Sequence, residues 1–411
     1  MLPSSPSLLF IPLSNYSPFM AGLIIKPRSR ILHGHDWVYS TEVEKKFGDP
    51  QPGDVVALKD FKDRSLGTAI YNPHSQIVAR RISRRKEDLD VDFFERRLRR
   101  ALTHREQLPG LDVRLCRLVW SEADGLPGVI VDRYGDHLVI QTLTLGMDQR
   151  KEMLSAALQN VFQPTSIVER NDSSIRLAEG LTQVTGMLFG ENPGPFTVNA
   201  AGISFQIDLL TGQKTGLYLD QLDAYASVAR WAKGRQVLDC FCNQGGFALA
   251  CAKAGAAAVT AVDISEDAIR ATQANAAANE VSELITATVG NVFDFLKAAE
   301  TAGQTWDLII LDPPSFTRSK KTLGDALRGY KEIHLRALKL LGPGGILSTY
   351  CCSHHVSQAD FRRVICEAAV DAKRTLRQIS YHTQRADHPI IPTLQETEYL
   401  KGWTYEVAAA F

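Results

Sequence analysis

Two apolar segments in the C-terminal half end in side chains that could do chemistry. One run ends at Asp312, and a second, about 40 residues later, ends at Cys352. Both runs have the composition of short buried strands, and the carboxyl ends of parallel strands are where ligands bind and react. The pairing suggests a thiolate that faces a flat, flipped-out base. A single cysteine is more often a small buried hydrophobic residue, so the elements around it must support the idea.

Upstream of Asp312 the sequence predicts a nucleotide-type cofactor site. A buried-strand pattern over 235–242 runs into a turn with Gly245 and Gly246, a helix pattern follows, and the next strand pattern ends in Asp263. Strand, glycine turn, helix and strand-terminal acid form the unit whose acid binds ribose hydroxyl groups. The turn lacks the G-x-G-x-x-G fingerprint of dinucleotide sites. A cofactor without a pyrophosphate, such as S-adenosylmethionine, therefore fits better than NAD.

Strand and helix patterns continue to alternate up to the C-terminus. The further strands are expected at 285–291, 306–311, 345–350, 375–382 and 399–407, and the further helices at 292–299, 330–341 and 361–373. The last two strands have no helix-length segment between them, so we expect an antiparallel edge pair. A Rossmann-like α/β sheet of seven strands with such an edge is the class I methyltransferase architecture, with right-handed crossovers.

The first half of the chain has a different pattern. Residues 23–91 hold short strand signals separated by turn residues, which indicates a small β-barrel. A linking helix is expected over 92–107 and a small α+β middle domain up to 194, with a hairpin over 128–143 and a helix over 147–161. The methyltransferase domain is expected over 195–411. Residues 1–22 are rich in Ser and Pro, so we expect a disordered segment or a true start at Met20.

Composition favours a cytoplasmic enzyme. The chain has 411 residues, no net charge and seven cysteines, an odd number without a disulfide-framework spacing, which points to a reducing compartment. No apolar run approaches the roughly 20 residues that span a bilayer, so no membrane association is expected. Cys240 and Cys242 do not have a zinc spacing, so no metal is expected.

Two basic clusters are candidates for contacts with RNA. One contains Arg80, Arg81, Arg84 and Arg85, and the other spans 96–100. Nearby acidic residues dilute both clusters, and a basic run is often only a solvated face. From the residues alone, RNA contact and a solvated surface are equally good readings.

An ordered set of motifs also runs through the chain. The motifs are His33–Ser40, Glu122–Gly128, Lys214–Gln221, Asp312–Phe316 and Cys352-Ser353. Together they resemble the large-subunit (23S) ribosomal RNA methyltransferases that make 5-methylcytosine with S-adenosylmethionine and carry an N-terminal PUA domain. The resemblance covers nearly the whole chain from about Leu23. It implies that residues 23–91 form a PUA-like RNA-binding domain and that the partner is large-subunit ribosomal RNA.

The resemblance also implies roles for individual residues. Cys352 is the expected nucleophile and Asp312 the catalytic group that binds the pyrimidine edge. Adjacent side chains of a strand point to opposite faces, so Cys351 is expected to pack against a helix instead. The expected substrate contacts are Pro313, Pro314, Phe316, Lys320, Arg80, Arg81, Arg84 and Arg85.

The cofactor is expected to contact the turn and the strand ends around it. The expected cofactor-binding residues are Gln221, Asp239, Phe241, Asn243, Gly245, Gly246, Asp263, Ile264, Asn291, Val292 and Asp312. Asp263 is expected to hold the ribose, Ile264 to pack on the adenine and Asn291 to accept from the adenine amino group. The motif Lys214–Gln221 is expected to form a strand and loop that cover the cofactor, with packing against the sheet edge as the alternative.

Two other functions stay open. The Asp-Pro-Pro turn also resembles the turn that orients an exocyclic amine of guanine or adenine for direct methylation, without a thiolate. A non-catalytic RNA-binding protein with the same fold is the second alternative, although the residues of the cofactor turn are present. A dehydrogenase is disfavoured because the phosphate-binding glycines are missing. A homodimer is kept as a possible assembly.

Overall fold

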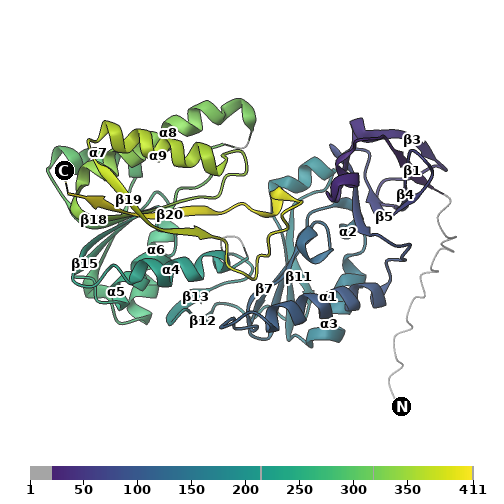
Figure 1. Ribbon diagram of the computed structural model, residues 1–411. Helices are drawn as coiled ribbons and strands as arrows, with labels where there is room; N and C mark the ends of the chain where they lie inside the picture. The colour runs from purple at the N-terminus through teal and green to yellow at the C-terminus, as the bar shows by residue number, and fades with distance from the viewer. Residues whose placement is uncertain (1–20, 213–214, 318, 410–411) are drawn as a thin grey trace, which may run out of the picture.

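The computed structural model describes residues 21–212, 215–317 and 319–409. These residues form four β-sheets, which Figure 1 shows in three parts: a purple N-terminal part, a blue middle part and a green to yellow C-terminal part. Met20, the alternative start, and Lys214, the first residue of the expected cover, lie outside the described residues. So do residues 1–19.

The N-terminal part is a six-stranded sheet with the order β2-β6-β5-β4-β1-β3. Its strands are β1 (Gly22–Ile25), β2 (Trp37–Tyr39), β3 (Val43–Phe47), β4 (Val55–Asp60), β5 (Ser65–Tyr71) and β6 (Ile77–Ser83). Alternate residues such as Leu23, Ile25, Val56 and Leu58 are fully buried in one cluster. The β-rich character predicted for this region is confirmed.

The middle part is a five-stranded sheet with the order β11-β10-β9-β8-β7, covered by helices. Its elements are α1 (Val91–Glu106), β7 (Leu115–Trp120), β8 (Val129–Tyr134), β9 (His137–Thr142), α2 (Leu145–Asp148), α3 (Lys151–Phe162), β10 (Ser166–Asn171) and β11 (Val184–Phe189). Asp90 caps α1 by accepting from the amide of Phe93 at 2.7 Å. The predicted hairpin is β8–β9, which pair antiparallel.

The C-terminal part is a seven-stranded sheet with the order β16-β15-β14-β17-β18-β20-β19, preceded by the hairpin β12 (Phe196–Ala200) and β13 (Ile203–Ile207). Its strands are β14 (Gln236–Cys240), β15 (Ala258–Asp263), β16 (Ile285–Val289), β17 (Trp306–Leu311), β18 (Leu341–Cys351), β19 (Thr375–Thr383) and β20 (Lys401–Ala408). The first five pair in parallel, and β20 runs antiparallel to β18 and β19. The predicted sheet and its antiparallel edge are therefore confirmed.

Helices cover both faces of this sheet, as Figure 1 shows. They are α4 (Leu222–Ala229), α5 (Gly246–Lys253) and α6 (Glu266–Ala278) on one face and α7 (Val292–Thr301), α8 (Leu323–Leu340) and α9 (Gln358–Asp371) on the other. Successive strand residues join different cores: Val237 and Leu308 pack with one cluster, Leu238 and Ile309 with the other. Burial on both faces explains why these strands are continuous apolar runs. None of the helices within the described ranges could cross a membrane.

Two helices differ most from the prediction, while α7 and α9 differ by two or three residues at their ends. Helix α8 begins at Leu323 rather than at Tyr330, because its apolar stripe continues toward the N-terminus past two glycines, which weaken a helix pattern. The helix expected over 147–161 is divided into α2 and α3. The break at Arg150 lies where its guanidinium donates to the carbonyl of Gly53 at 3.0 Å.

Candidate active site

The chain turns sharply after β14, where the cofactor turn was predicted. Phe241 and Asn243 have φ values of 64° and 49°, and Gly245 has 83°, so three of five residues are left-handed. For residues other than glycine this backbone costs energy, and such strain concentrates at functional sites. A Cβ atom on Gly246 would lie 2.4 Å from the ring of Tyr225. Glycine is therefore required there for the close approach of α4 and α5.

Asp263 closes the same turn from the end of β15. One carboxylate oxygen accepts from the amide of Asn243 and the other from the amide of Ser265, both at 2.9 Å. The carboxylate is half-buried and keeps further lone pairs for ligand hydroxyls. The next side chain, Ile264, is 70% exposed. A large apolar side chain left open beside this acid suits an aromatic ring of a ligand.

Asn291 lies beyond the end of β16 and is exposed. Its side-chain oxygen accepts from the amide of Phe293 at 2.9 Å and so forms the N-cap of α7. Val292, the next residue, is buried in the core. The contact of Asn291 with adenine stays a prediction. In the structure, its side chain also stabilises the start of α7.

Two buried oxygens at this edge have no hydrogen-bond partner among the described residues, Asp239 Oδ1 and Gln221 Oε1. The other oxygen of Asp239 accepts from the amide of Ala248 at 2.9 Å. Burial raises the pKa of Asp239 well above its usual range, and Asp312 and Asp263 raise it further. Unsatisfied buried acceptors are costly unless a ligand donates to them. S-adenosylmethionine carries an ammonium donor and a positive sulfonium, so these residues fit this cofactor.

Asp312 and Cys352 follow neighbouring parallel strands. In the pairing of β17 with β18, Leu311 lies opposite Thr349, so Asp312 and Cys352 emerge from the same edge of the sheet. Gln221 Nε2 donates to Asp312 Oδ2 at 2.7 Å, which fixes that carboxylate. The structure thus brings the two predicted catalytic residues together with Gln221 at one edge.

The two adjacent cysteines lie on opposite faces. Cys351 is fully buried in the core that contains α8, with its Sγ 3.4 Å from the hydroxyl of Tyr330. Cys352 is half-buried and packs against the core on the other face. The prediction that Cys351 packs against a helix is confirmed.

Sequence reasoning missed Tyr218 as a residue of the site. Its phenol is half-buried, burial raises its pKa, and Asp312, Asp220, Cys352 and Asp263 raise it further. Tyr218 is therefore close enough to Asp312, Cys352 and Asp263 for their charges to act on its phenol. The signal was available, since Tyr218 belongs to the motif 214–221.

The segment 215–221 is anchored by the middle domain. Thr215 Oγ1 donates to Asp132 Oδ2 at 2.5 Å, and the amide of Leu217 donates to the Tyr134 hydroxyl at 3.0 Å. Its last three residues form a 3-10 helix (Leu219–Gln221), so the strand predicted here is wrong. Thr215 and Leu217 are buried, and their bonds to β8 hold them in place of a strand partner. The segment is a wall between two domains.

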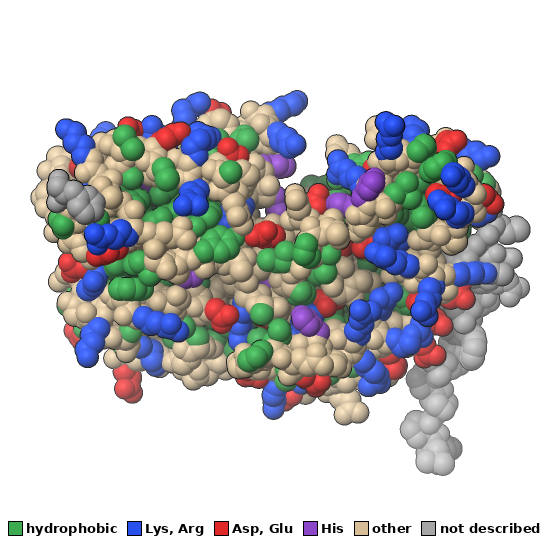
Figure 2. Space-filling view, viewed as in Figure 1, with side chains coloured by type: hydrophobic (Ala, Val, Ile, Leu, Met, Phe, Trp, Pro, Cys, Tyr) green, Lys and Arg blue, Asp and Glu red, His purple; other side chains and the backbone are tan. Residues whose placement is uncertain are grey.

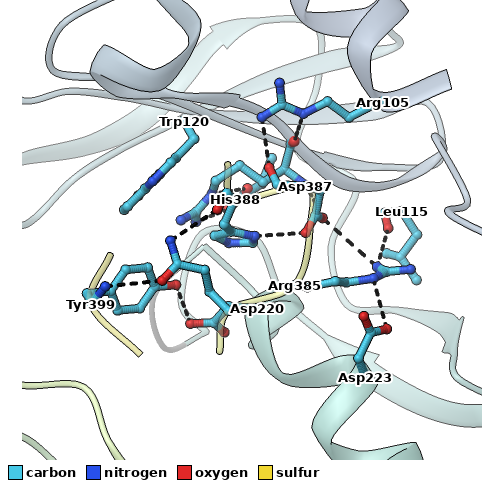
Figure 3. A network of polar contacts seen from close by, with 12 residues as sticks. Arg105, Leu115, Trp120, Asp220, Asp223, Arg385, Asp387, His388 and Tyr399 are labelled. Carbon is cyan, nitrogen blue, oxygen red and sulfur yellow. Dashed lines mark hydrogen bonds and ion pairs between the residues drawn. The ribbon is translucent and has the colours of Figure 1, made fainter. Parts of the chain in front are cut away.

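A network of polar contacts, drawn in Figure 3, extends this wall toward the loop between β19 and β20. Tyr399 donates to Asp220 Oδ2 at 2.5 Å, and the amide of Arg385 donates to the Asp220 carbonyl at 2.9 Å. Asp387 pairs with His388 at 2.8 Å, and its carbonyl accepts from Arg105 at 2.8 Å. The network therefore joins α1 and the middle domain to the catalytic edge.

The predicted substrate contacts in and after the Asp-Pro-Pro turn differ in their exposure to solvent. Pro313 is buried, Pro314 is exposed, and Lys320 is exposed in the 3-10 helix Lys320–Thr322. Phe316 packs in an aromatic group, with its ring centroid 4.6 Å from that of Tyr330. Pro314 and Lys320 are thus open to a substrate, whereas Phe316 mainly supports the turn.

Two of the four predicted RNA-binding arginines are held in ion pairs within the protein. Arg80 lies 2.7 Å from Glu122, which also accepts from Trp37 at 2.7 Å, and Arg81 lies 2.6 Å from Asp36. Burial opposes ionisation of Glu122, but Arg80 keeps its pKa below the usual range. Carboxylates of the protein thus already pair with Arg80 and Arg81, and the contact of these two side chains with RNA stays a prediction.

A buried lysine supports the turn after Cys352 and was not predicted from the sequence. Lys401 lies opposite Cys351 in the β18–β20 pairing, and its Nζ donates to the carbonyls of Ser353 at 2.7 Å and Val356 at 2.8 Å. Burial lowers the pKa of Lys401, and nearby Cys351 and Cys352 act in the opposite direction. A lysine inside the apolar strand pattern near the C-terminus was the available signal.

The sheet order, the glycine turn and the strand-terminal acids define a class I methyltransferase that uses S-adenosylmethionine. Residues 182–393 match the family described as S-adenosylmethionine-dependent methyltransferase, and residues 25–84 match a PUA-like domain. The chain is 39% identical over 389 residues to ribosomal RNA large subunit methyltransferase I of Photobacterium profundum, which covers 92% of this chain and 97% of that protein. With the protein of the same name from Shewanella denitrificans, identity is 41% over 375 residues, 90% of this chain and 94% of that one. The chain belongs to the ribosomal RNA large subunit methyltransferase I family.

Solved structures with the same fold are also known. The chain superposes on a SAM-dependent methyltransferase from Streptococcus mutans with a TM-score of 0.81 at 24% identity, covering 94% of this chain and all (100%) of that one. A methyltransferase complexed with SAH gives a TM-score of 0.82 at 24% identity, with the same coverage. At this identity the likeness establishes the fold alone.

Proposed function

We propose that the protein methylates carbon 5 of a cytosine in large-subunit ribosomal RNA through a covalent bond between Cys352 and carbon 6 of the ring. One observation carries the proposal: Cys352, and not Cys351, lies on the face of the sheet that carries the core beside the cofactor turn. The names of the relatives, which refer to large-subunit ribosomal RNA, support the substrate class. A cytoplasmic location agrees with that substrate.

The covalent step answers a chemical difficulty, because carbon 5 of cytosine is a poor nucleophile. When the Cys352 thiolate adds to carbon 6, an S–C bond forms and the ring electrons move to carbon 5. S-adenosylmethionine, when bound, supplies the methyl group as an electrophile. A base then removes the proton from carbon 5, the double bond between carbons 5 and 6 re-forms, and the thiolate leaves.

The protein's polar groups support this chemistry at the ring edge. Asp312, fixed by Gln221 at 2.7 Å, can accept from the cytosine amino group or donate to the ring nitrogen in its protonated form. The exposed Pro314 offers a rigid apolar surface for the flipped base. Asp263, Ile264 and the turn at Gly245 would hold the ribose, the adenine and the methionine part of the cofactor.

The test is an adduct assay with RNA that contains 5-fluorocytosine, in which fluorine blocks the proton loss needed for release. The unchanged protein should form a complex that survives denaturation, and Cys352→Ser should abolish both the complex and methylation, by more than about 10³-fold. Cys351→Ser is the matched control, since this thiol is one residue away but faces α8. Cys351→Ser should keep the yield of the complex and the rate of methylation within a few-fold of the unchanged protein.

Other outcomes would identify a different chemistry. A denaturation-resistant complex that depends on Cys351 would move the nucleophile to the other face. Methylation that persists in Cys352→Ser, with no complex from either thiol, would favour direct methylation of an exocyclic amine. The position of the methyl group, read by mass spectrometry of digested RNA, separates these outcomes.

A further inference from the structure

A basic cleft lies apart from the catalytic edge, between the PUA-like domain, α1 and the middle domain. Its volume is about 880 Å³, within the range of binding sites for small molecules. The basic side chains that line it are Arg81, Arg84, Arg85, Arg96, Arg97, Arg100 and His104. The acidic ones are Asp36, Glu87 and Asp124. Figure 2 shows Lys and Arg gathered over the part of the molecule where α1 and the PUA-like domain lie.

The acids of the cleft are already neutralised, so its charge is positive. Asp36 pairs with Arg81 at 2.6 Å, and Asp124 pairs with the fully buried Arg105 at 2.5 Å. Glu87 reaches Arg96 at 3.7 Å. The excess positive charge therefore comes from the other cations of the cleft.

Arg84, Arg85 and Arg100 are exposed and make no ion pair with any residue in the described ranges. Arg97 is held between them by a bond to the carbonyl of Ile82 at 2.7 Å and by stacking over Phe93. Burial lowers the pKa of Arg97, Glu87 acts in the opposite direction, and the neighbouring Arg100 and Arg96 lower it further. Arginines crowded in this way repel each other until an anion lies among them.

The walls of the cleft indicate which anion fits. No Phe, Tyr or Trp belongs to its described lining, which otherwise consists of small and aliphatic residues. Stacking of splayed bases requires such rings, whereas phosphate groups require arginine forks. Its cations lie along two stretches of chain, 81–85 and 96–104, so a chain of phosphates fits the cleft better than a single one.

The cleft also reaches the catalytic domain. Pro389, Ile390 and Ile391, from the loop between β19 and β20, form one side of it. The same loop contains Asp387, whose carbonyl accepts from Arg105 at 2.8 Å, and Tyr399, which donates to Asp220 at 2.5 Å. An RNA bound here would touch an element that also holds the wall of the catalytic site.

We propose that this cleft binds the phosphate backbone of the substrate RNA outside the catalytic pocket, independently of base sequence. The identity of the RNA in this proposal rests on the proposed function. The presence of the anion site does not. Arg84, Arg85 and Arg100 make the phosphate contacts, while Arg81 and Arg97 shape the cleft. This site would position the ribosomal RNA so that a separate nucleotide enters the pocket at Cys352.

The experiment measures binding of a fluorescent RNA stem-loop of arbitrary sequence to the full chain as the KCl concentration is varied. The triple variant Arg84→Ala, Arg85→Ala, Arg100→Ala should bind at least about tenfold more weakly, and the slope of log K against log salt should fall by about 2–3. The matched control Arg99→Ala, Arg270→Ala, Arg363→Ala loses the same charge from exposed ion pairs elsewhere. It should retain most of the slope.

Kinetics and a second ligand separate this proposal from the proposed function. With large-subunit ribosomal RNA, the cleft variant should raise KM while kcat at saturating RNA stays within about twofold, and Cys352→Ser should bind RNA normally without methylating it. If both triple variants lost the same RNA affinity, the loss would reflect only the lower net charge of the protein, and the proposed phosphate site would be wrong. Unchanged RNA binding in the cleft variant would also overturn the site, including the case in which inorganic phosphate or ATP binds there instead.

Discussion

The catalytic edge and the junction of the three domains are built in opposite ways. At the edge, side chains follow neighbouring parallel strands of one sheet, as Asp312 and Cys352 do. At the junction, polar partners lie far apart in the sequence: Arg80 and Glu122 are 42 positions apart, and Arg105 and Asp387 are 282 apart. The edge derives its geometry from a regular fold, whereas the junction depends on individual long-range pairs.

The two regions also differ in how their polar groups are satisfied. Arg105, fully buried, donates to the carbonyls of Arg117 and Asp387 and to both oxygens of Asp124. Among the described residues, the edge instead contains two buried acceptors without partners, Asp239 Oδ1 and Gln221 Oε1, whereas at the junction a buried donor, Arg80 Nε, has none. A satisfied network stabilises a single arrangement, while unsatisfied acceptors are held ready for a ligand. The Arg105 network at the junction is therefore built for stability, and the open acceptors of the edge for binding.

Breaking the junction should have the largest effect on stability. Arg105→Met leaves Asp124 without its buried partner, so we expect a loss of about 3–5 kcal/mol in the free energy of unfolding. Urea unfolding followed by circular dichroism measures it. Arg99→Met, on the same helix but in an exposed pair with Glu95, should cost less than about 1 kcal/mol. Equal costs for the two variants would mean that the network contributes nothing beyond surface pairing.

A buried histidine in the catalytic domain should make that domain sensitive to acid. Burial lowers the pKa of His334 to about 4, although its bond to the Tyr330 carbonyl acts against this. Because that carbonyl only accepts, Nδ1 carries the proton, and Nε2 accepts from Thr349 at 2.8 Å. As the pH falls from about 6.5 to about 4, the unfolded state binds a proton that the native state refuses.

His334 should therefore remove up to about 3 kcal/mol of stability over that pH range. The variant His334→Gln, measured by urea unfolding at several pH values, should show a flatter dependence by that amount. His74→Gln, at an exposed position of the PUA-like domain, should leave the slope unchanged. Parallel curves for all three proteins would show that acid acts elsewhere, for instance at the junction.

The smallest expected effect concerns the cofactor at the catalytic edge. Asp263→Ala removes a carboxylate that we expect to accept from the ribose, so S-adenosylmethionine affinity should fall at least about tenfold in calorimetry. Asp267→Ala is the control, because that side chain is exposed on α6 and pairs with Arg270. Unchanged affinity in Asp263→Ala would place the ribose acid elsewhere. RNA binding should not change in either variant.

The same contrast explains what could be predicted from the sequence. Strand β17 has the predicted bounds, and the glycine turn and Asp263 occupy the predicted positions, because local patterns determine them. The ion pairs of Arg80 and Arg81 could not be predicted, because their partners, Glu122 and Asp36, are distant in the sequence and look like surface acids.

The segment 215–221 is a second case in which contacts with distant residues could not be predicted from the sequence. Its residues resemble a strand, but the hydroxyl of Tyr134 and the carboxylate of Asp132 hold it from another domain. Lys401 was overlooked for a related reason, since the carbonyls that accept from it belong to a turn about 45 residues earlier. No periodicity in the chain encodes such contacts.

The anchoring of this segment limits how the protein could be divided or recombined. A fragment that began near residue 195 would contain every strand of the seven-stranded sheet, yet it would lose Asp132 and Tyr134, which anchor the segment 215–221. The middle domain thus anchors a segment of the candidate active site as well as acting as a spacer. We expect the two domains to have been inherited together, since an exchange of either one would require its new neighbour to supply the same hydroxyl and carboxylate.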